Sequence, residues 1–410
     1  MGKFNWHSSI GLCIVLTCCS IASAGNIEIV VNPTLYASGE ITASLNQYIA
    51  DVQAQGHTPI LTTSAFADAA ALRSHLANRY NTDGLDGAVF IGDMPNARYE
   101  ATDISTFPCD LYYMDLDGSW TDTDSDSYLD THEAGTGDEL PEIFLGRIAA
   151  GCGVSLYPGS TEASLLNQYF QKNHAYRAGQ LSVAPDGLAY VDDDWAYSAN
   201  NWARDMSLAL TGTVTVINDP NTTADDHYEA QLATGEYENL WIGVHSNGSY
   251  HNFEQPFEGD WNAGDDWRWT TSQEVAAMNP KVLFYNLWAC FAGDYSKNGF
   301  LNAAYIFGND YGLLACGSSK SGGMLWCTDI YFGSLGAGKT FGQAFYDWWL
   351  AEADCYSVPG EYEAFNVGWH YGQTLMGDPL LVTQAYIPEP ATLMLLTSGS
   401  ACLTLRRKRA

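Results

Sequence analysis

Two segments of the sequence carry residues that suit thiol-based catalysis. One is a short apolar run, residues 240–244, that leads into His245, and the other is an apolar run, residues 282–289, that leads into Cys290. A thiolate is a strong nucleophile, and a neighbouring base raises its reactive fraction. A histidine also protonates a leaving amine, because its ordinary pKa lies near neutral pH. The sequence therefore predicts a catalytic dyad of His245 and Cys290.

The two apolar runs are expected to position these side chains. Each run is short and bounded by polar or turn residues, which is typical of a buried parallel strand. Ligands of parallel sheets bind outside the carboxyl ends of the strands, so neighbouring strands would present imidazole and thiol together. We expect the main-chain N–H groups of Ser246 and Cys290 to bind the developing oxyanion. The alternative is that Cys290 is a small buried hydrophobe and His245 an ordinary core residue.

The cysteine segment carries a family resemblance. Residues 289–295 read Ala-Cys-Phe-Ala-Gly-Asp-Tyr, which resembles the cysteine block of the gingipain family in the caspase-like clan of cysteine peptidases. The dyad spacing of 45 positions is also close to the roughly 50 of caspases. Three further segments resemble strands of this family: Val89–Asp93, Pro141–Ile148 and Met376–Val382. The family histidine is usually followed by glycine, whereas Ser246 stands here.

The resemblance spans about residues 85–382 and implies an endopeptidase that acts on protein or peptide substrates. It implies that Cys290 is the nucleophile, that His245 is the acid and base, and that residues 317–323 form part of the substrate groove. It also implies an α/β fold with caspase-like or gingipain-like parallel sheets, flanked by helices, in two abutting subdomains. Two rival functions remain open: a catalytically inactive caspase-like protein that binds envelope or matrix components, and a transpeptidase that uses the same thiol.

The alternation of patterns along the chain agrees with an α/β fold. Apolar runs alternate with helical periodicity, which predicts right-handed crossovers and a parallel sheet. The expected strands are 27–31, 59–62, 87–91, 187–191, 214–217, 240–244, 282–288 and 312–316, and the expected helices are 38–55, 65–80, 160–176, 197–210, 224–233 and 341–351. We divide the chain into a signal peptide (1–24), an N-terminal subdomain (25–180), a catalytic subdomain (181–386) and a sorting signal (387–410).

Both ends of the sequence indicate export. The first 24 residues combine Lys3, an apolar run and a small-residue cleavage site, the order of a signal peptide. Near the C-terminus, Pro-Glu-Pro at 388–390 precedes an apolar stretch and the basic cluster 406–409, which resembles a PEP-CTERM sorting tail. This resemblance implies an exosortase-type enzyme as partner and an extracytoplasmic protein of a Gram-negative-type bacterium, in the envelope or secreted. It implies membrane contact only through the transient tail; a permanent anchor is the alternative.

The net charge of the chain bears on its binding partners, and its cysteines bear on possible disulfides. The chain has 17 basic and 48 acidic residues, a net charge of −31, and removal of both ends would leave 12 against 47, about −35. Such a surface repels nucleic acid, so no nucleic-acid partner is expected. The part between the two ends contains Cys109, Cys152, Cys290, Cys316, Cys327 and Cys355. An oxidising compartment permits disulfides, and we expect the pairs Cys109–Cys152 and Cys316–Cys327.

An acidic segment in the N-terminal half matches a calcium-binding loop. Against the twelve-residue template, acids fall at positions 1, 3, 5, 9 and 12, with a main-chain carbonyl at position 7. The expected ligands of a structural Ca²⁺ are Asp122, Asp124, Asp126, Tyr128, Asp130 and Glu133. Ser127 replaces the usual glycine at position 6, which makes the turn costlier. A solvated acidic loop is the alternative.

Two other segments were singled out near the expected dyad. Asp192, Asp193 and Asp194 follow a strand at the same edge, and we expect them to cap the next helix rather than orient His245. Residues 250–271 are rich in Trp, Asp and Gly without clear periodicity, which predicts a binding loop. The His and Cys spacings here do not resemble a zinc site, so no catalytic metal is expected.

Overall fold

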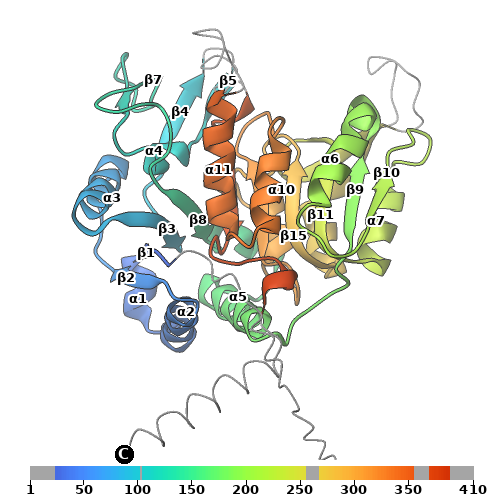
Figure 1. The fold of residues 1–410 in the computed structure, drawn as a ribbon, viewed down its shortest axis with the longest axis horizontal. Coiled ribbons are helices and arrows are strands. Elements are labelled where there is room, and N and C mark those ends of the chain that lie inside the picture. The colour runs from blue at the N-terminus through green and yellow to red at the C-terminus, as the bar shows by residue number, and fades with distance from the viewer. Residues whose placement is uncertain (1–23, 102–103, 255–266, 355–368, 388–410) are drawn as a thin grey trace, which may run out of the picture.

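One large mixed sheet forms the centre of the molecule (Figure 1). The structure, a computed structural model, describes residues 24–101, 104–254, 267–354 and 369–387. The ten strands follow the order β10-β9-β11-β15-β16-β17-β8-β3-β1-β2. Their bounds are β1 (Asn26–Val31), β2 (Thr58–Thr62), β3 (Leu85–Ile91), β8 (Phe144–Ile148), β9 (Gly187–Val191), β10 (Val214–Ile217), β11 (Glu236–Gly243), β15 (Lys281–Trp288), β16 (Leu314–Ser318) and β17 (Gln373–Gly377). The predicted α/β class is confirmed.

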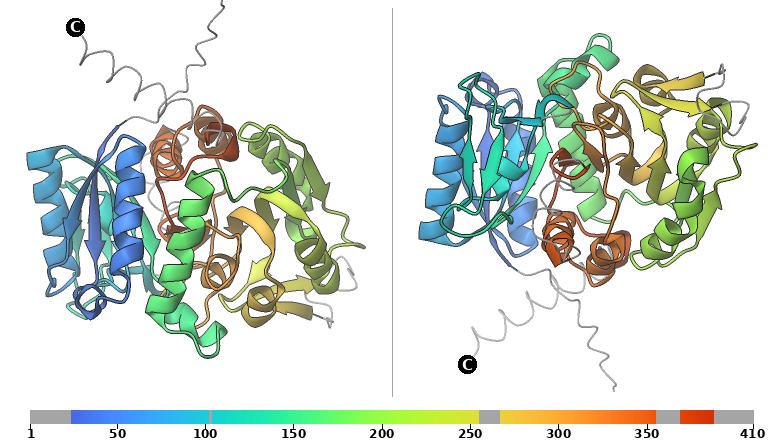
Figure 2. Two further views of the ribbon diagram at one scale, coloured as in Figure 1. Left: turned by 90° about the horizontal axis from the view of Figure 1, so that it is seen from below. Right: turned by 90° about the horizontal axis from the view of Figure 1, so that it is seen from above.

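Helices cover both faces of this sheet and bury a core on each (Figure 2). Along β3, Ala88 and Phe90 point into one core while Val89 and Ile91 point into the other, as expected for a strand buried on both faces. One face is covered by α2 (Thr42–Ala54), α5 (Glu162–Arg177), α7 (Asp225–Thr234), α8 (Ser272–Met278) and α9 (Leu301–Ile306). The other is covered by α3 (Ala69–Asp83), α4 (Leu111–Met114), α6 (Ala199–Met206), α10 (Thr328–Gly336) and α11 (Phe341–Asp354).

The first predicted helix is two helices. The segment expected as 38–55 contains the end of α1 (Pro33–Ser38) and the whole of α2. Gly39 stops α1 in the left-handed conformation, at φ 73°, and its N–H donates to the main-chain oxygen of Tyr36. Glycine favours this helix ending because it has no Cβ to clash with the backbone.

Three small antiparallel sheets form in the segments that connect the elements of the large sheet. They are β4 (Arg98–Ala101) with β5 (Ile104–Pro108), β6 (Ser119–Thr121) with β7 (Thr131–Glu133), and β12 (His245–Ser246) with β13 (Tyr250–Glu254) and β14 (Trp267–Thr271). The prediction of an irregular loop over 250–271 is therefore wrong at both of its ends. Aromatic residues favour strands, and these ends pair as an antiparallel ladder. Phe257 and Trp261 lie outside the described residues.

The large sheet runs through both predicted subdomains. β17 pairs antiparallel with β16 and meets β8 at one position, Met376 opposite Arg147. Directly after β17, the buried carboxylate of Asp378 accepts hydrogen bonds from Tyr48 of α2 at 3.0 Å and Asn173 of α5 at 2.8 Å. The Gly-Asp-Pro segment therefore locks the helical layer of one face onto the middle of the sheet.

The disulfide predictions are wrong for the cysteines that the structure describes. Cys109, Cys152 and Cys316 are free thiols, so neither predicted pair forms. Cys109 and Cys316 are fully buried, and this burial raises the pKa of the Cys316 thiol to about 12. Both behave as small hydrophobes of the core, for which a free cysteine is well suited.

Candidate active site

His245 and Cys290 follow neighbouring strands at equivalent positions. β11 pairs in parallel with β15, and Gly243 lies opposite Trp288, so each residue stands two positions beyond a matched pair. The Ser246 hydroxyl donates to the main-chain oxygen of Cys290 and ties the two strand ends together. Both dyad residues are half-buried. The strand adjacency predicted from the sequence is confirmed, and the two residues emerge at one edge of the sheet.

Asp194 approaches the same histidine from the other side. β9 pairs with β11 on the side away from β15, and Val191 lies opposite Gly243. Three residues later, the Oδ2 atom of Asp194 lies 2.8 Å from Nε2 of His245. Nε2 of the imidazole therefore faces this carboxylate. The indole of Trp195 packs edge-on against the imidazole, with ring centroids 4.5 Å apart.

The expected capping role of the acidic run is wrong. Asp192 precedes the 3-10 turn η2 (Asp193–Ser198), which leads into α6, but its side chain makes no capping hydrogen bond. Asp192 is buried, and this burial together with repulsion from Asp193 raises its pKa to about 7. The sequence signal for Asp194 was an acidic run directly after a strand at the dyad's edge. Only the order of the strands could show that this run lies beside His245.

The turn after the proposed nucleophile is strained and held in place. Phe291 adopts φ 61°, a conformation that costs a side-chain-bearing residue about 1–2 kcal/mol. Its N–H donates to the Lys320 main-chain oxygen and the N–H of Gly293 donates to that of Ser318, both at 2.8 Å. A Cβ at Gly293 would lie 2.8 Å from the Thr374 side chain. Glycine therefore lets this turn pack tightly against β16 and β17.

The ladder between β12 and β13 orients one of the proposed oxyanion donors. Ser246 lies opposite His251, and the next pair is joined by a bond from the Asn247 N–H to the Tyr250 oxygen at 3.3 Å. Hydrogen-bonded and non-bonded pairs alternate in an antiparallel ladder. The N–H of Ser246 therefore points away from β13, as an oxyanion donor must. The matching role of the Cys290 N–H stays a prediction.

The end of the cysteine block is anchored in a buried ion pair. Arg147 and Asp110 are 2% and 3% exposed in their side chains, with N–O distances from 2.6 to 3.0 Å. The guanidinium of Arg147 stacks on the Tyr295 ring, 4.2 Å from its centroid. The Tyr295 hydroxyl donates to Asp110 at 2.8 Å, and the Thr374 hydroxyl does so at 2.6 Å. The sequence singled out the Gly-Arg strand and the cysteine block separately, and the fold joins them.

The carboxylate of Asp122 holds the sharp turn of the acidic hairpin. The carboxylate of Asp122 accepts main-chain N–H bonds from Ser125 at 2.7 Å, Asp126 at 3.2 Å and Ser127 at 2.8 Å. Desolvation opposes ionisation of Asp122, but these N–H bonds hold its pKa below the usual value. Ser127, at the template position of glycine, adopts φ 81°. The chain therefore makes the sharp turn without a glycine.

The hairpin gathers most, but not all, of the predicted ligands. At the tip of the hairpin, carboxylate oxygens lie within 4.8 Å of one another in two overlapping groups: Asp122 with Asp124 and Asp130, and Glu100 with Asp124 and Asp126. Desolvation and repulsion from Asp126 raise the pKa of Asp124. Glu133 belongs to neither group, and the main-chain carbonyl of Tyr128 stays a prediction. Glu100, on β4, was not foreseen, because only the pairing of this strand with the hairpin brings it close.

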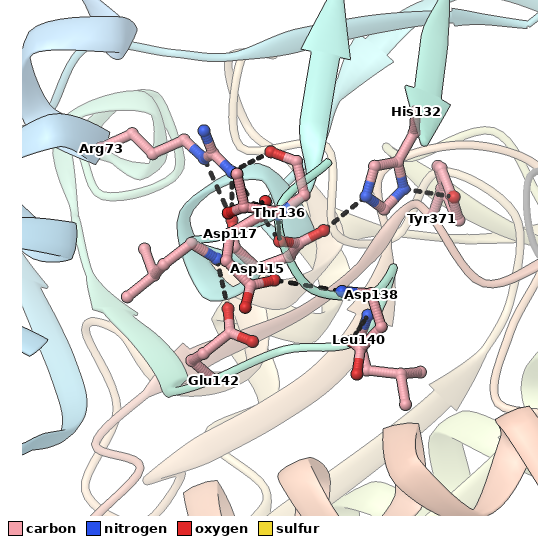
Figure 3. A network of polar contacts seen from close by, with 11 residues as sticks. Arg73, Asp115, Asp117, His132, Thr136, Asp138, Leu140, Glu142 and Tyr371 are labelled. Carbon is pink, nitrogen blue, oxygen red and sulfur yellow. Dashed lines mark hydrogen bonds and ion pairs between the residues drawn. The ribbon is translucent and has the colours of Figure 1, made fainter. Parts of the chain in front are cut away.

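A buried polar network fixes the base of the hairpin (Figure 3). His132 lies between Asp115, which contacts its Nε2, and the hydroxyl of Tyr371, 2.6 Å from its Nδ1. The Trp120 ring stacks on this imidazole at a centroid distance of 3.6 Å. Burial, and then repulsion from Asp115 and other acids, raises the pKa of Glu142 to about 7. Because the Asp115 carboxylate already contacts His132, we interpret Asp115, His132 and Tyr371 as a structural network that holds the base of the hairpin in place.

Comparisons with known proteins place the fold. A solved structure described as the Arg-specific cysteine proteinase gingipain R matches with TM-score 0.58 and 14% identity, covering 89% of this chain and 80% of the other. A second, described as a protease, matches with TM-score 0.57 and 12% identity, covering 89% and 79%. Comparison with curated proteins gave no match.

A family model for the PEP-CTERM protein-sorting motif matches residues 387–409. This tail implies recognition by exosortase-type sorting machinery and indicates export to the cell envelope of a Gram-negative bacterium. Within the described ranges, none of the helices has the length and hydropathy of a membrane span. The signal peptide predicted at 1–24 falls almost wholly outside those ranges. The chain thus combines the caspase-like α/β fold of gingipain R with a PEP-CTERM sorting tail.

Proposed function

We propose that this protein is an exported cysteine endopeptidase. The observation that carries the proposal is the equivalent placement of His245 and Cys290 beyond paired parallel strands, with Asp194 against the histidine. In this scheme the Cys290 sulfur attacks the scissile carbonyl carbon while His245 takes the thiol proton. The N–H groups of Ser246 and Cys290 stabilise the oxyanion. His245 then protonates the departing amine, and water hydrolyses the thioester to release the acid and the thiol.

A covalent probe tests this proposal. A peptide carrying a thiol-reactive group is expected to label wild-type protein and to leave the Cys290→Ala variant unlabelled. Cys152→Ala is the matched control: Cys152 is another half-buried thiol, and burial followed by the charge of Asp93 raises its pKa. Equal labelling of wild type and Cys290→Ala would show that Cys290 is not the nucleophile and would favour an inactive binding protein.

Product analysis separates the two thiol-based functions. Hydrolysis gives a free carboxylate on the amino-side product even when amine nucleophiles are added. A transpeptidase would instead join that product to the amine, because the amine competes with water for the thioester.

Removing the charge of Asp194 is expected to slow the reaction. In Asp194→Asn the imidazole loses the carboxylate that orients Nε2 and stabilises the imidazolium, so we expect kcat/KM to fall about tenfold or more. The loss should lie in kcat, with a small change in KM, measured with one peptide substrate. Asp193→Asn is the matched control, because burial raises the pKa of Asp193 and the amide mimics its protonated form. Equal losses in both variants would assign the effect to the acidic run as a whole.

We also propose that the hairpin binds a structural Ca²⁺ through Asp122, Asp124, Asp126 and Asp130, with Glu100. Carboxylate oxygens are the ligands that this cation prefers, and several lie close enough to share one ion. The template ligands Tyr128 and Glu133 remain part of the sequence prediction. The cation would relieve the repulsion that raises the pKa of Glu100 and Asp124.

Chelation is expected to lower the melting temperature by roughly 3–4 °C when the starting calcium concentration is about 100-fold above Kd. Asp124→Asn should abolish this calcium dependence, because Asp124 belongs to both carboxylate groups. The Glu133→Gln variant distinguishes Glu133, the ligand that the template predicts, from Glu100, the ligand that the structure suggests. It should keep the calcium response if Glu100 is the ligand. A melting temperature that is the same with calcium and with chelator would contradict the site.

A further inference from the structure

A cavity of about 490 Å³ opens beside the proposed dyad. Its walls include Asn247, which follows Ser246, and Phe291, which follows Cys290. Ser319, directly after β16, also lines it, and Thr106, on β5, contributes a wall from the N-terminal half of the chain. Its position beside the two proposed oxyanion donors means that a peptide held for attack by Cys290 would pass its mouth.

Most of the side chains that line this cavity are polar, and they include one carboxylate. Among the described residues that form it, Phe291 supplies the one apolar side chain. Asp294 is 5% exposed and places a carboxylate in the wall. Its Oδ1 accepts the N–H of Ser296 at 3.1 Å, which fixes the side chain. Lys297 and Asn298 are exposed and stand at the mouth.

Aromatic rings surround the imidazole of His245. Trp195 packs on it, and the Trp195 ring lies 4.6 Å from that of Trp288. Trp267 packs edge-on at 5.7 Å. A peptide at the proposed dyad would therefore lie near both aromatic rings and the cavity.

The cavity is held open by bonds between its walls. Arg98 of β4 donates to the Thr106 main-chain oxygen at 2.6 Å and to the Ser296 hydroxyl at 3.3 Å, joining the N-terminal half to the wall that carries Asp294. The Leu301 N–H donates to the oxygen of Gly248 at 2.8 Å. Gly248 adopts φ 93°, and a Cβ there would lie 2.9 Å from the oxygen of Phe291. Such preorganisation favours a binding site, because little ordering is needed when a ligand enters.

We propose that this cavity is a substrate subsite that binds one polar, hydrogen-bond-donating side chain next to the scissile bond. This class includes Ser, Thr, Asn, Gln and Lys, whose donors match the carboxylate of Asp294. The proposal rests on the peptidase function, because it requires a peptide held at Cys290. It adds the class of residue that the enzyme selects at one position.

Cleavage of a mixed peptide library by wild type, Asp294→Asn and a control variant tests the subsite. Product sequences of the wild type should be enriched in donor-bearing residues at one position beside the cleaved bond. Asp294→Asn keeps Oδ1 as an acceptor for Ser296 but removes the charge, so the enrichment at that position should fall about tenfold. Asp310→Asn is the control, since this exposed acid precedes β16 at the opposite edge of the sheet and should leave the profile unchanged.

A second variant and a binding measurement keep the outcomes distinct. Asn298→Leu alters the exposed mouth and should shift the same position toward apolar residues. An unchanged profile in both variants, or an apolar preference in the wild type, would overturn the subsite while leaving the peptidase intact. If wild type cleaves nothing, the peptidase proposal fails. Binding of donor-bearing peptides to Cys290→Ala, weakened by Asp294→Asn, would then still support the cavity; no such binding would overturn it.

Discussion

Replacing His245 with glutamine is expected to lower kcat/KM by at least about 10³-fold. Glutamine keeps hydrogen-bonding capacity toward Asp194 but cannot take the thiol proton or return it to the leaving amine, and general acid–base catalysis is worth about 10²–10⁴-fold. The loss should be accompanied by slow probe labelling at neutral pH, because no neighbouring base is left to take the thiol proton of Cys290. Steady-state kinetics on one peptide and the rate of probe labelling measure the two effects.

His174→Gln is the matched control for this variant. His174 also pairs with a carboxylate, that of Asp51 at 2.9 Å, but it lies on α5 among the helices and not at the carboxyl edge of β11. Its replacement should leave both rates within about twofold of wild type. Retention of most activity in His245→Gln would place the base elsewhere and remove the dyad from the mechanism.

Replacing Arg147 with methionine is expected to cost about 3–5 kcal/mol of unfolding free energy. The change leaves the Asp110 carboxylate buried without its cation, and breaking a buried pair by removing one partner has a cost of this size. The hydroxyls of Thr374 and Tyr295 still donate to Asp110, so we expect the loss of unfolding free energy to lie near the lower end of this range. A shift of the urea-unfolding midpoint to lower concentration measures it.

The matched control is the exposed pair of Lys281 and Glu236, which lie 2.6 Å apart with side chains about half exposed. Lys281→Met should change stability by no more than about 1 kcal/mol, because solvent screens such pairs. Equal midpoints for the two variants would mean that the buried pair does not hold the sheet to the cysteine turn. A milder variant, Tyr295→Phe, keeps the ring on Arg147 and removes the bond to Asp110, so it should reduce activity more than stability.

The strands of the candidate site were predictable because their signal is local. The runs ending at His245 and Cys290 are apolar, short and bounded by turn residues, and β11 and β15 appear where these patterns predict them. The helix boundaries were less accurate because a single residue decides them: Gly39 ends α1 within a segment whose periodicity suggested one helix. The aromatic segment 250–271 was misread because the pairing of β13 with β14 depends on contacts distant in sequence.

The chemistry of the site divides in the same way. The residue types of the proposed dyad and the acid spacing of the hairpin are written in the chain, because both depend on side chains at fixed positions. The contact of Asp194 with His245 could not be predicted from the sequence, since it requires β9 to lie next to β11. Glu100 joins the hairpin acids, and Arg147 meets Tyr295, for the same reason.

The sequence by itself determined the class of fold, the sorting tail and the two residues that could act as nucleophile and base, because each depends on composition or short spacing. The tertiary structure alone decided which acid faces the imidazole, that Cys109, Cys152 and Cys316 form no disulfide, and where a cavity opens beside the proposed nucleophile. These features join segments from separate strands and from both halves of the chain. Such contacts depend on strand order and register, which local sequence patterns do not encode.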